Sequence, residues 1–373
     1  MERRNTIVKN VFIITIHTGF NFGSVLQAIA TCNVLKLQGY SPVIINYIQN
    51  AYTYREYFRK SVQSLRSIAR GIKRLPLFIA NNLIYTGYLR KNVKMTSPIY
   101  EKDNFSEKMN SLINTYGRGY FLTGSDQVWN TFFNGYDLRY FFNGLKGIKV
   151  SYASSIGKTD LDERDKKMLC ENLKDYRAIS VRESSAVMIL NSLGYNATLL
   201  LDPTFMLDRD QWKTYQTAHQ LVKERYILMY LPYNINDKDV IFNSARKLAK
   251  EKRLEIVTFS WGYSNDKYAD HTIRFASPGD FLRLMMDADY VFTNSFHGTA
   301  FSINLNKQFW VYMPTQFTTR IQSILDFLHL QCRVLDKEIT SEQISKEIIY
   351  DDINKKLSDE RAKSYYFIAN SLK

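Results

Sequence analysis

The sequence of 373 residues predicts an α/β protein made of two doubly wound, Rossmann-like domains. Three observations support this fold class. The chain is too long for one typical domain core. Short β-branched, apolar runs alternate with amphipathic helical patterns, and this alternation restarts after Pro203, which interrupts regular structure. We therefore expect domains at 1–205 and 206–345, followed by a C-terminal helix at 346–373 that packs back on them.

The first domain opens with a βαβ pattern. A strand, a helix and a second strand are expected at 8–16, 24–38 and 43–46. Ser24 is the expected N-cap of the helix, and Gly39 is expected to end it. A basic insertion follows at 47–98. Beyond it, the same criteria predict helices at 103–114, 161–174 and 183–193. They predict strands at 119–123, 147–153 and 178–181.

The second domain repeats the alternation without a comparable insertion. Strands and helices are expected in turn at 225–231, 237–251, 255–259, 278–286, 290–293, 298–305, 308–312 and 319–328. Such alternation is typical of a parallel sheet covered on both faces. Two facing domains of this kind describe a GT-B-like architecture, in which ligands bind at the carboxyl ends of the strands.

The positive charge of the chain is concentrated in one segment. The formal net charge is +14, and residues 50–95 contain ten Lys or Arg but one acid, Glu56. Apolar residues recur there near helical spacing, so this basic amphipathic segment is either a solvated helix face or a membrane-surface contact. No nucleic-acid-binding motif accompanies it. The apolar run at 11–16 is too short for a signal or membrane segment, so we expect a cytoplasmic protein, peripheral on the membrane at most.

Metal and cofactor signals are weak. The three cysteines form no CxxC pair, and the five histidines show no metal-ligand spacing, so no metal site is expected. The loop at 19–23 does not match the dinucleotide-binding pattern GxGxxG. We expect no resident cofactor.

The strand at 290–293 leads directly into Asn294-Ser-Phe-His-Gly298 and a helix. A helix N-terminus at a strand's carboxyl end favours an anion, and Gly298 would allow a phosphate to approach the backbone. His297 has the side chain suited to proton transfer near neutral pH. The alternative is a capping turn in which His297 satisfies backbone carbonyls.

Two arginines are also candidates for binding an anion. Arg182 succeeds the strand at 178–181, and Arg320 begins the helix at 319–328. Each guanidinium could bind a carboxylate or phosphate in a bidentate manner. The alternative for Arg182, favoured when it is considered alone, is a surface pair with Glu183 or a solvated position.

In the first domain, Asp126, Gln127 and Trp129 follow a strand in a polar loop. Carboxylates and amides bind sugar hydroxyls, and an indole can cover the apolar face of a sugar ring. The alternative is a loop in which Asp126 caps a turn and Trp129 packs inward. Asn21 and Tyr152 are expected on the same rim.

Seven short motifs in order resemble the polysaccharide pyruvyl transferase family. They are Asn21-Phe-Gly-Ser-Val-Leu-Gln27, Gly124-Ser-Asp-Gln-Val-Trp-Asn130, Ser151-Tyr-Ala-Ser-Ser155, Ser180-Val-Arg-Glu183, Leu201-Asp-Pro-Thr204, Thr293-Asn-Ser-Phe-His-Gly298 and Arg320-Ile321. The resemblance covers nearly the whole chain, but the insertion matches no family motif.

This resemblance implies a GT-B-like fold and transfer of pyruvate from phosphoenolpyruvate onto two hydroxyls of one sugar, as a ketal, in capsular or other surface polysaccharide biosynthesis. It implies His297 as the catalytic residue. The implied donor-binding residues are Arg182, Ser295, Gly298, Thr299 and Arg320. The implied acceptor-binding residues are Asn21, Phe22, Gly23, Asp126, Gln127, Trp129 and Tyr152.

The expected partners are phosphoenolpyruvate and a glycan acceptor linked to a lipid at the inner membrane face. Two other functions remain open. One is a GT-B glycosyltransferase that uses a sugar nucleotide, and the other is a non-catalytic scaffold of a polysaccharide assembly complex.

Overall fold

The computed structural model describes residues 9–61, 65–233, 238–260, 266–316 and 318–373. The chain divides into two compact units. Unit 1 comprises residues 1–76, 89–203 and 362–373, and unit 2 comprises residues 77–88 and 204–361. The expected starts of a strand at residue 8 and of a helix at residue 237 lie outside the described residues.

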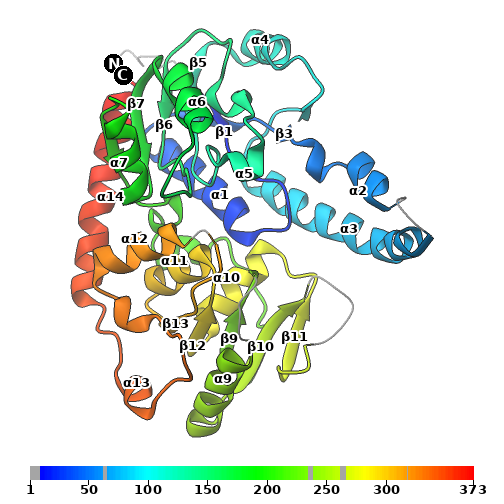
Figure 1. The fold of residues 1–373 in the computed structure, drawn as a ribbon, viewed down its shortest axis with the longest axis vertical. Helices are drawn as coiled ribbons and strands as arrows, with labels where there is room; N and C mark the ends of the chain where they lie inside the picture. Colours follow the sequence, from blue (N-terminus) through cyan, green and yellow to red (C-terminus); the bar gives the residue numbers. More distant parts are fainter. Residues whose placement is uncertain (1–8, 62–64, 234–237, 261–265, 317) are drawn as a thin grey trace, which may run out of the picture. The chain divides into compact units, whose positions relative to one another are not determined.

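Unit 1 is built on a six-stranded parallel sheet with helices beside it (Figure 1). Its strands, in spatial order, are β2 (Ser41–Ile44), β1 (Asn10–Ile14), β5 (Gly119–Thr123), β6 (Lys149–Ser151), β7 (Tyr176–Val181) and β8 (Ala197–Leu199). Its helices include α1 (Phe22–Leu37), α4 (Phe105–Tyr116), α5 (Thr131–Asn134), α6 (Glu163–Leu173) and α7 (Ser184–Ser192).

Unit 2 contains a five-stranded parallel sheet. Its strands, in spatial order, are β11 (His271–Arg274), β10 (Glu255–Ser260), β9 (Tyr226–Tyr230), β12 (Tyr290–Thr293) and β13 (Gln308–Val311). The helices are α8 (Arg209–Lys213), α9 (Lys238–Lys252), α10 (Pro278–Asp287), α11 (Phe296–Asn304), α12 (Thr319–Leu328), α13 (Ser341–Ser345) and the first part of α14 (Asp351–Ser371). The predicted α/β fold with two parallel sheets is confirmed.

Both faces of each sheet are covered. In β1, the consecutive residues Val11, Phe12, Ile13 and Ile14 are all fully buried, although successive side chains of a strand point to opposite faces. In unit 2, the rings of Phe292 on β12 and Trp310 on β13 stack with centroids 5.3 Å apart. Burial on both sides explains why the strands consist of continuous apolar runs.

The insertion contains the two helices α2 (Tyr54–Ser61) and α3 (Leu65–Asn92) and the strand β3 (Tyr47–Ile48). Strand β3 pairs with β4 (Ile99–Tyr100), which directly follows the insertion. The Tyr57 hydroxyl on α2 donates a hydrogen bond of 2.7 Å to the carbonyl of Gly71 on α3. None of the helices within the described part of the chain is long and apolar enough to cross a membrane.

Two local expectations need correction. Helix α1 begins earlier than expected, because Asn21 rather than Ser24 is its N-cap: the Asn21 side chain accepts a hydrogen bond of 3.2 Å from the amide of Ser24. The edge strands β8 and β11 were not predicted from the sequence. Both are short strands at a sheet edge, where few apolar residues identify a strand.

Each sheet has a topological switch point, on either side of which successive strands extend the sheet in opposite directions. In unit 1 this switch point lies between β1 and β5, and in unit 2 it lies between β9 and β12. At such a point the loops leaving neighbouring strands diverge and leave a crevice outside the carboxyl ends, which is the usual ligand position in open α/β sheets. Asn21 and Asp126 follow β1 and β5, and His297 follows β12, at these two points.

Candidate active site

The unit 2 switch point is shaped by the turn from β12 into α11. The Thr293 hydroxyl donates a hydrogen bond of 2.7 Å to the Tyr230 carbonyl on β9 and accepts one of 3.1 Å from the Ser295 amide. The Ser295 side chain is the N-cap of α11 and accepts a hydrogen bond of 3.4 Å from the Gly298 amide. The positive end of the α11 dipole therefore faces the carboxyl edge of this sheet.

The Phe296 ring contacts both Arg320 and His297 at this helix end. The Arg320 guanidinium carbon is 5.5 Å from the centroid of the Phe296 ring, and the Phe296 and His297 rings meet edge to face at 5.1 Å. Arg320 and His297 are each 3% exposed. Phe296 thus contacts both a cation and an imidazole ring.

Arg320 is a buried cation for which the described part of the chain offers no acidic partner. Within the described ranges, no carboxylate forms an ion pair with it, and its buried Nε atom has no hydrogen-bond partner. Burying an uncompensated charge is costly, and a buried guanidinium normally pairs with an anion. This arrangement is suited to a bound carboxylate or phosphate.

Close packing of α11 leaves no space for a side chain at Gly298. A Cβ atom at this position would lie 2.2 Å from Thr293 Oγ1 and 3.0 Å from Tyr230 Cδ1. The missing side chain therefore allows α11 to pack closely on β12 and β9. The Thr299 hydroxyl is also engaged within the helix, since it donates a hydrogen bond of 3.0 Å to the Ser295 carbonyl.

Asn294 fixes the neighbouring loop after β9. Its side-chain amide donates a hydrogen bond of 2.7 Å to the Tyr233 carbonyl and accepts one of 3.4 Å from the Tyr233 amide. Asn294 is fully buried. The two loops that flank the unit 2 switch point are therefore joined through one side chain.

The unit 1 switch point is a dense polar network around Asp126. Asp126 follows β5 with a positive φ of 75°, a conformation that few residues other than glycine adopt. Its carboxylate accepts a hydrogen bond of 2.5 Å from the Ser24 hydroxyl on α1 and one of 2.8 Å from the Gln127 amide. The Gln27 amide joins the network by donating to the Thr15 hydroxyl at 3.0 Å.

Arg182 lies inside this network. Its side chain is 1% exposed, and it pairs with Asp202 through Nη1 and with Asp126 at 3.4 Å through Nη2. Glu183 lies 3.9 Å from Nε. These carboxylates raise the pKa of Arg182 against the desolvation that lowers it. One guanidinium thus holds together the loops that follow β5, β7 and β8.

Five further predicted residues of unit 1, among them Gln127, are all buried. Trp129 is buried, and its ring stacks on Phe141 with centroids 5.6 Å apart and an interplanar angle of 6°. Tyr152, Phe22 and Gly23 are also buried. The Gln127 side chain accepts a hydrogen bond of 2.8 Å from Asn130.

The structure brings the predicted residues together in two groups. Ser295, His297, Gly298, Thr299 and Arg320 gather at the unit 2 switch point. Arg182, expected with them as a donor ligand, belongs to unit 1 and joins Asp126 instead. Asn21 begins α1, which also carries Ser24 of the Asp126 network.

Phe296, Ser24 and Asp202 were not predicted as site residues, although all three lie in the quoted motifs. Phe296 contacts both Arg320 and His297. Asp202 accepts hydrogen bonds from Arg182 and, at 2.8 Å, from the Ser125 hydroxyl. An aspartate directly after an apolar run and before a proline is the signal that could have indicated Asp202 as a buried partner at a strand end.

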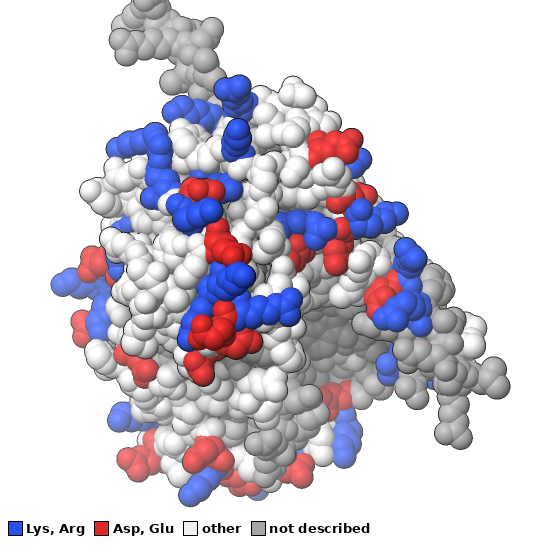
Figure 2. Space-filling model, turned by 45° about the horizontal axis from the view of Figure 1, so that its top comes forward, with Lys and Arg blue, Asp and Glu red and all other residues white. Residues whose placement is uncertain are grey.

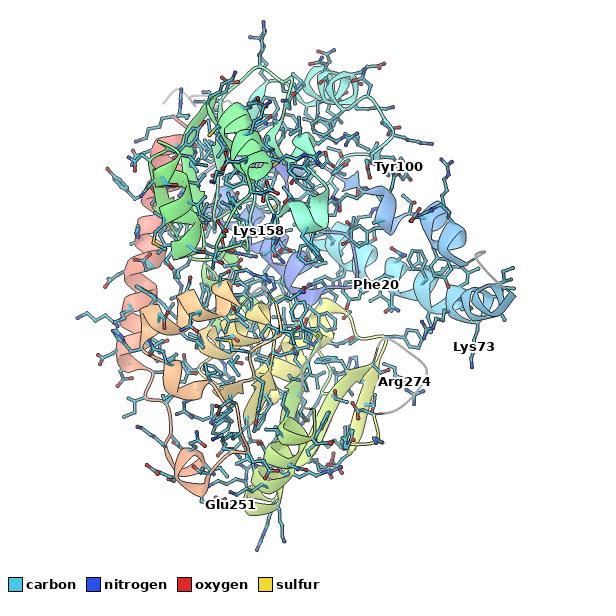
Figure 3. The ribbon with its side chains drawn as sticks, in the orientation of Figure 1. Phe20, Lys73, Tyr100, Lys158, Glu251 and Arg274 are labelled. Atoms are coloured by element: carbon cyan, nitrogen blue, oxygen red, sulfur yellow. The ribbon has the colours of Figure 1, made fainter. Side chains whose placement is uncertain are left out.

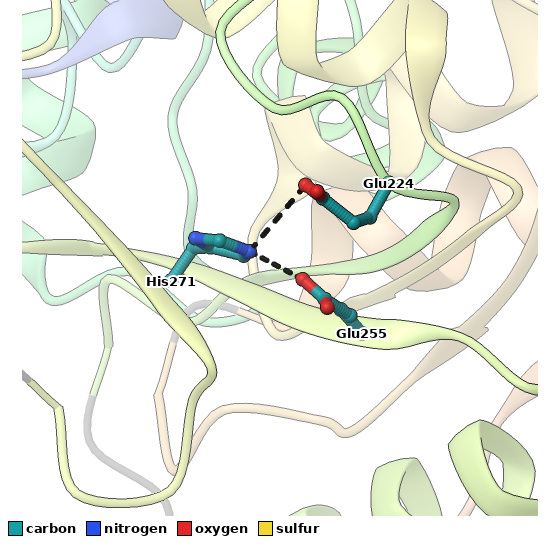
Figure 4. A group of neighbouring side chains, drawn as sticks. All are labelled: Glu224, Glu255 and His271. Atoms are coloured by element: carbon teal, nitrogen blue, oxygen red, sulfur yellow. Dashed lines mark hydrogen bonds and ion pairs between the residues drawn. The ribbon is translucent and has the colours of Figure 1, made fainter.

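One group of side chains resembles a metal-ligand set that spacing did not predict. Glu224, Glu255 and His271 lie with one ligand atom each within 4.8 Å of one another (Figure 4). His271 Nε2 contacts Glu255 and lies 3.8 Å from Glu224 Oε2. All three precede or begin strands, at the amino edge of the sheet. A cation there would lie at the opposite edge from His297.

The fold defines the class of the protein as GT-B-like. Among solved structures, it is similar to UDP-GlcNAc 2-epimerase from Neisseria meningitidis bound to UDP-GlcNAc, with a TM-score of 0.52, 11% identity, and coverage of 98% of this chain and 97% of that chain. It is also similar to the Methanocaldococcus jannaschii UDP-GlcNAc 2-epimerase, with a TM-score of 0.53, 8% identity, and coverage of 90% of this chain and 90% of that chain. For UGT89C1 of Arabidopsis thaliana complexed with UDP, the TM-score is 0.51 and the identity 9%, and the match covers 98% of this chain and 99% of that chain. At these identities the likeness concerns the fold alone.

Sequence defines the family within that class. The model of the polysaccharide pyruvyl transferase family matches residues 21–314, most of the chain, which therefore belongs to this family. A comparison with curated proteins finds no significant match.

Proposed function

We propose that this chain transfers pyruvate from phosphoenolpyruvate to two hydroxyls of one sugar residue in surface or capsular polysaccharide biosynthesis. The first hydroxyl adds to C2 while C3 gains a proton and becomes a methyl group. The second hydroxyl displaces phosphate from C2, and its proton leaves with the phosphate or to solvent. The product is a cyclic ketal, and no resident metal or cofactor is needed in this scheme.

The observation that carries the proposal is Arg320, a buried guanidinium without an acidic partner in the described chain, beside the N-terminus of α11. Phosphoenolpyruvate has a phosphate and a carboxylate, and a guanidinium together with a helix N-terminus binds such anions. Between the two predicted donor arginines, this geometry favours Arg320, because Arg182 already faces three carboxylates.

His297 is proposed as the acid or base of the reaction. Its ring lies against Phe296 at the same helix end as Arg320, so a donor bound there would be adjacent to it. A neutral imidazole would accept the proton of an attacking hydroxyl, and an imidazolium would protonate the departing phosphate. We propose that Asp126, Gln127 and Asn21 bind the acceptor, because they supply carboxylate and amide groups at the other switch point.

The reaction predicts phosphate release that requires both phosphoenolpyruvate and an acceptor. We expect release with a glycan extract from the source cells, lipid-linked and soluble, together with an acceptor mass gain of one pyruvate less water. Parallel reactions with nucleotide sugars are the control. Turnover of a nucleotide sugar in place of phosphoenolpyruvate would instead support a glycosyltransferase, and turnover of neither would support a scaffold.

A further inference from the structure

Helix α3 has one face that is packed and another that is not. The packed face consists of residues spaced four apart, which are all buried: Leu77, Asn81, Tyr85 and Leu89. Such spacing defines one stripe along a helix. This stripe is the buried side of α3.

The opposite side of α3 carries exposed apolar side chains. Ile72 is 68% exposed, Ile79 is 37% exposed and Leu83 is 67% exposed. At 3.6 residues per turn, positions seven and eleven residues after Ile72 lie within about 40° of one another around the helix. These three residues, which we call the apolar row, contribute little to folding and present branched apolar groups to solvent.

The helices α2 and α3 also carry exposed cations. The exposed residues of the two helices include Arg55, Arg59, Lys73, Arg74, Arg90 and Lys91. The single acid of this segment, Glu56, pairs with Arg59 at 2.7 Å. Figure 3 shows Lys73 extending from α3. Over the rest of the face in Figure 2, basic and acidic side chains are interspersed.

We infer that the apolar row and its flanking cations form a docking surface for an anionic lipid bilayer. A helix that lies in the bilayer interface inserts its apolar side among the acyl chains while Lys and Arg contact lipid phosphates. Arg90, eighteen residues after Ile72, lies on the same side of the helix as the apolar row. A nucleic acid would use the cations but would leave this row exposed to water. The inference does not rest on the proposed function, because it needs no substrate.

Vesicle co-sedimentation of the full chain tests the inference. We expect binding to phosphatidylcholine vesicles that contain phosphatidylglycerol, weaker binding as salt rises, and little binding to phosphatidylcholine alone. The triple variant Ile72→Ser, Ile79→Ser, Leu83→Ser should lose at least tenfold in apparent affinity for the anionic vesicles. The matched control is Met188→Ser with Ile349→Ser, which removes exposed apolar side chains elsewhere, and it should bind like the natural chain.

Three results would overturn the inference. They are absence of binding by the natural chain, retention of binding by the triple variant, and an equal loss in the control. Circular dichroism identifies a variant that fails to fold, in which case the single change Leu83→Ser replaces the triple variant and should still weaken binding. Phosphate release from phosphoenolpyruvate with a soluble acceptor should be unchanged in the triple variant, so failure of lipid binding is distinguishable from failure of the proposed reaction.

Discussion

Replacement of Arg182 by methionine is expected to lower the free energy of unfolding by about 3–5 kcal/mol. The guanidinium is buried among Asp126, Glu183 and Asp202, and its removal would leave these carboxylates without their cation. Methionine fills a similar volume, so the loss comes mainly from uncompensated charge. The loop that carries Asp126 should therefore lose its ion pair with residue 182.

Urea denaturation followed by circular dichroism, with hydrogen exchange of the β7 amides, measures this effect. The control is Arg177→Met, because Arg177 lies on the same strand with an exposed side chain and should change stability little. An unchanged unfolding midpoint together with weaker phosphoenolpyruvate binding would contradict this interpretation. It would support the alternative that Arg182 binds the donor.

The change His297→Asn is expected to reduce kcat for pyruvate transfer by about 10²–10⁴-fold, the usual contribution of a general acid or base. Asparagine keeps a polar side chain of moderate size but does not exchange a proton near neutral pH. The KM for phosphoenolpyruvate should change less than kcat, since Arg320 and the α11 N-terminus remain. Steady-state phosphate release at several pH values measures both parameters.

The matched control for this change is His329→Asn. His329 is an exposed C-cap of α12 with a φ of 59°, a left-handed conformation that asparagine tolerates. This variant should retain both activity and stability. A His297→Asn enzyme with kcat near that of the natural chain would remove His297 from the mechanism.

The regular part of the fold was predictable because burial on both faces leaves a strong local pattern. The run Val11–Ile14 and the strand β12 are continuous apolar segments, and the following helices have clear amphipathic stripes. Strand β11 was missed because its four residues are partly or fully exposed and polar in part. Its identity as a strand depends on pairing with β10, which only the folded chain provides.

The candidate site was predictable in position but less so in detail. Strand ends and helix starts in the sequence indicated residues at the carboxyl ends of strands, which the topology of parallel sheets brings to one edge. The environment of Arg182 depends on Asp126 and Asp202, which lie 56 and 20 residues away. Likewise, the reason for glycine at position 298 is contact with Thr293 and Tyr230. Side-chain contacts of this kind have no local sequence signal.

Binding of phosphoenolpyruvate to the Arg320→Met variant tests the central claim most directly. Loss of a charge-assisted contact of about 1.5–3 kcal/mol corresponds to a roughly 10–150-fold weaker Kd. Isothermal titration calorimetry should show this loss, while Arg283→Met, which removes an arginine paired with Asp287 in the same unit, should bind like the natural chain. A folded Arg320→Met variant with unchanged affinity for phosphoenolpyruvate would contradict the assignment of the donor to the α11 end of unit 2.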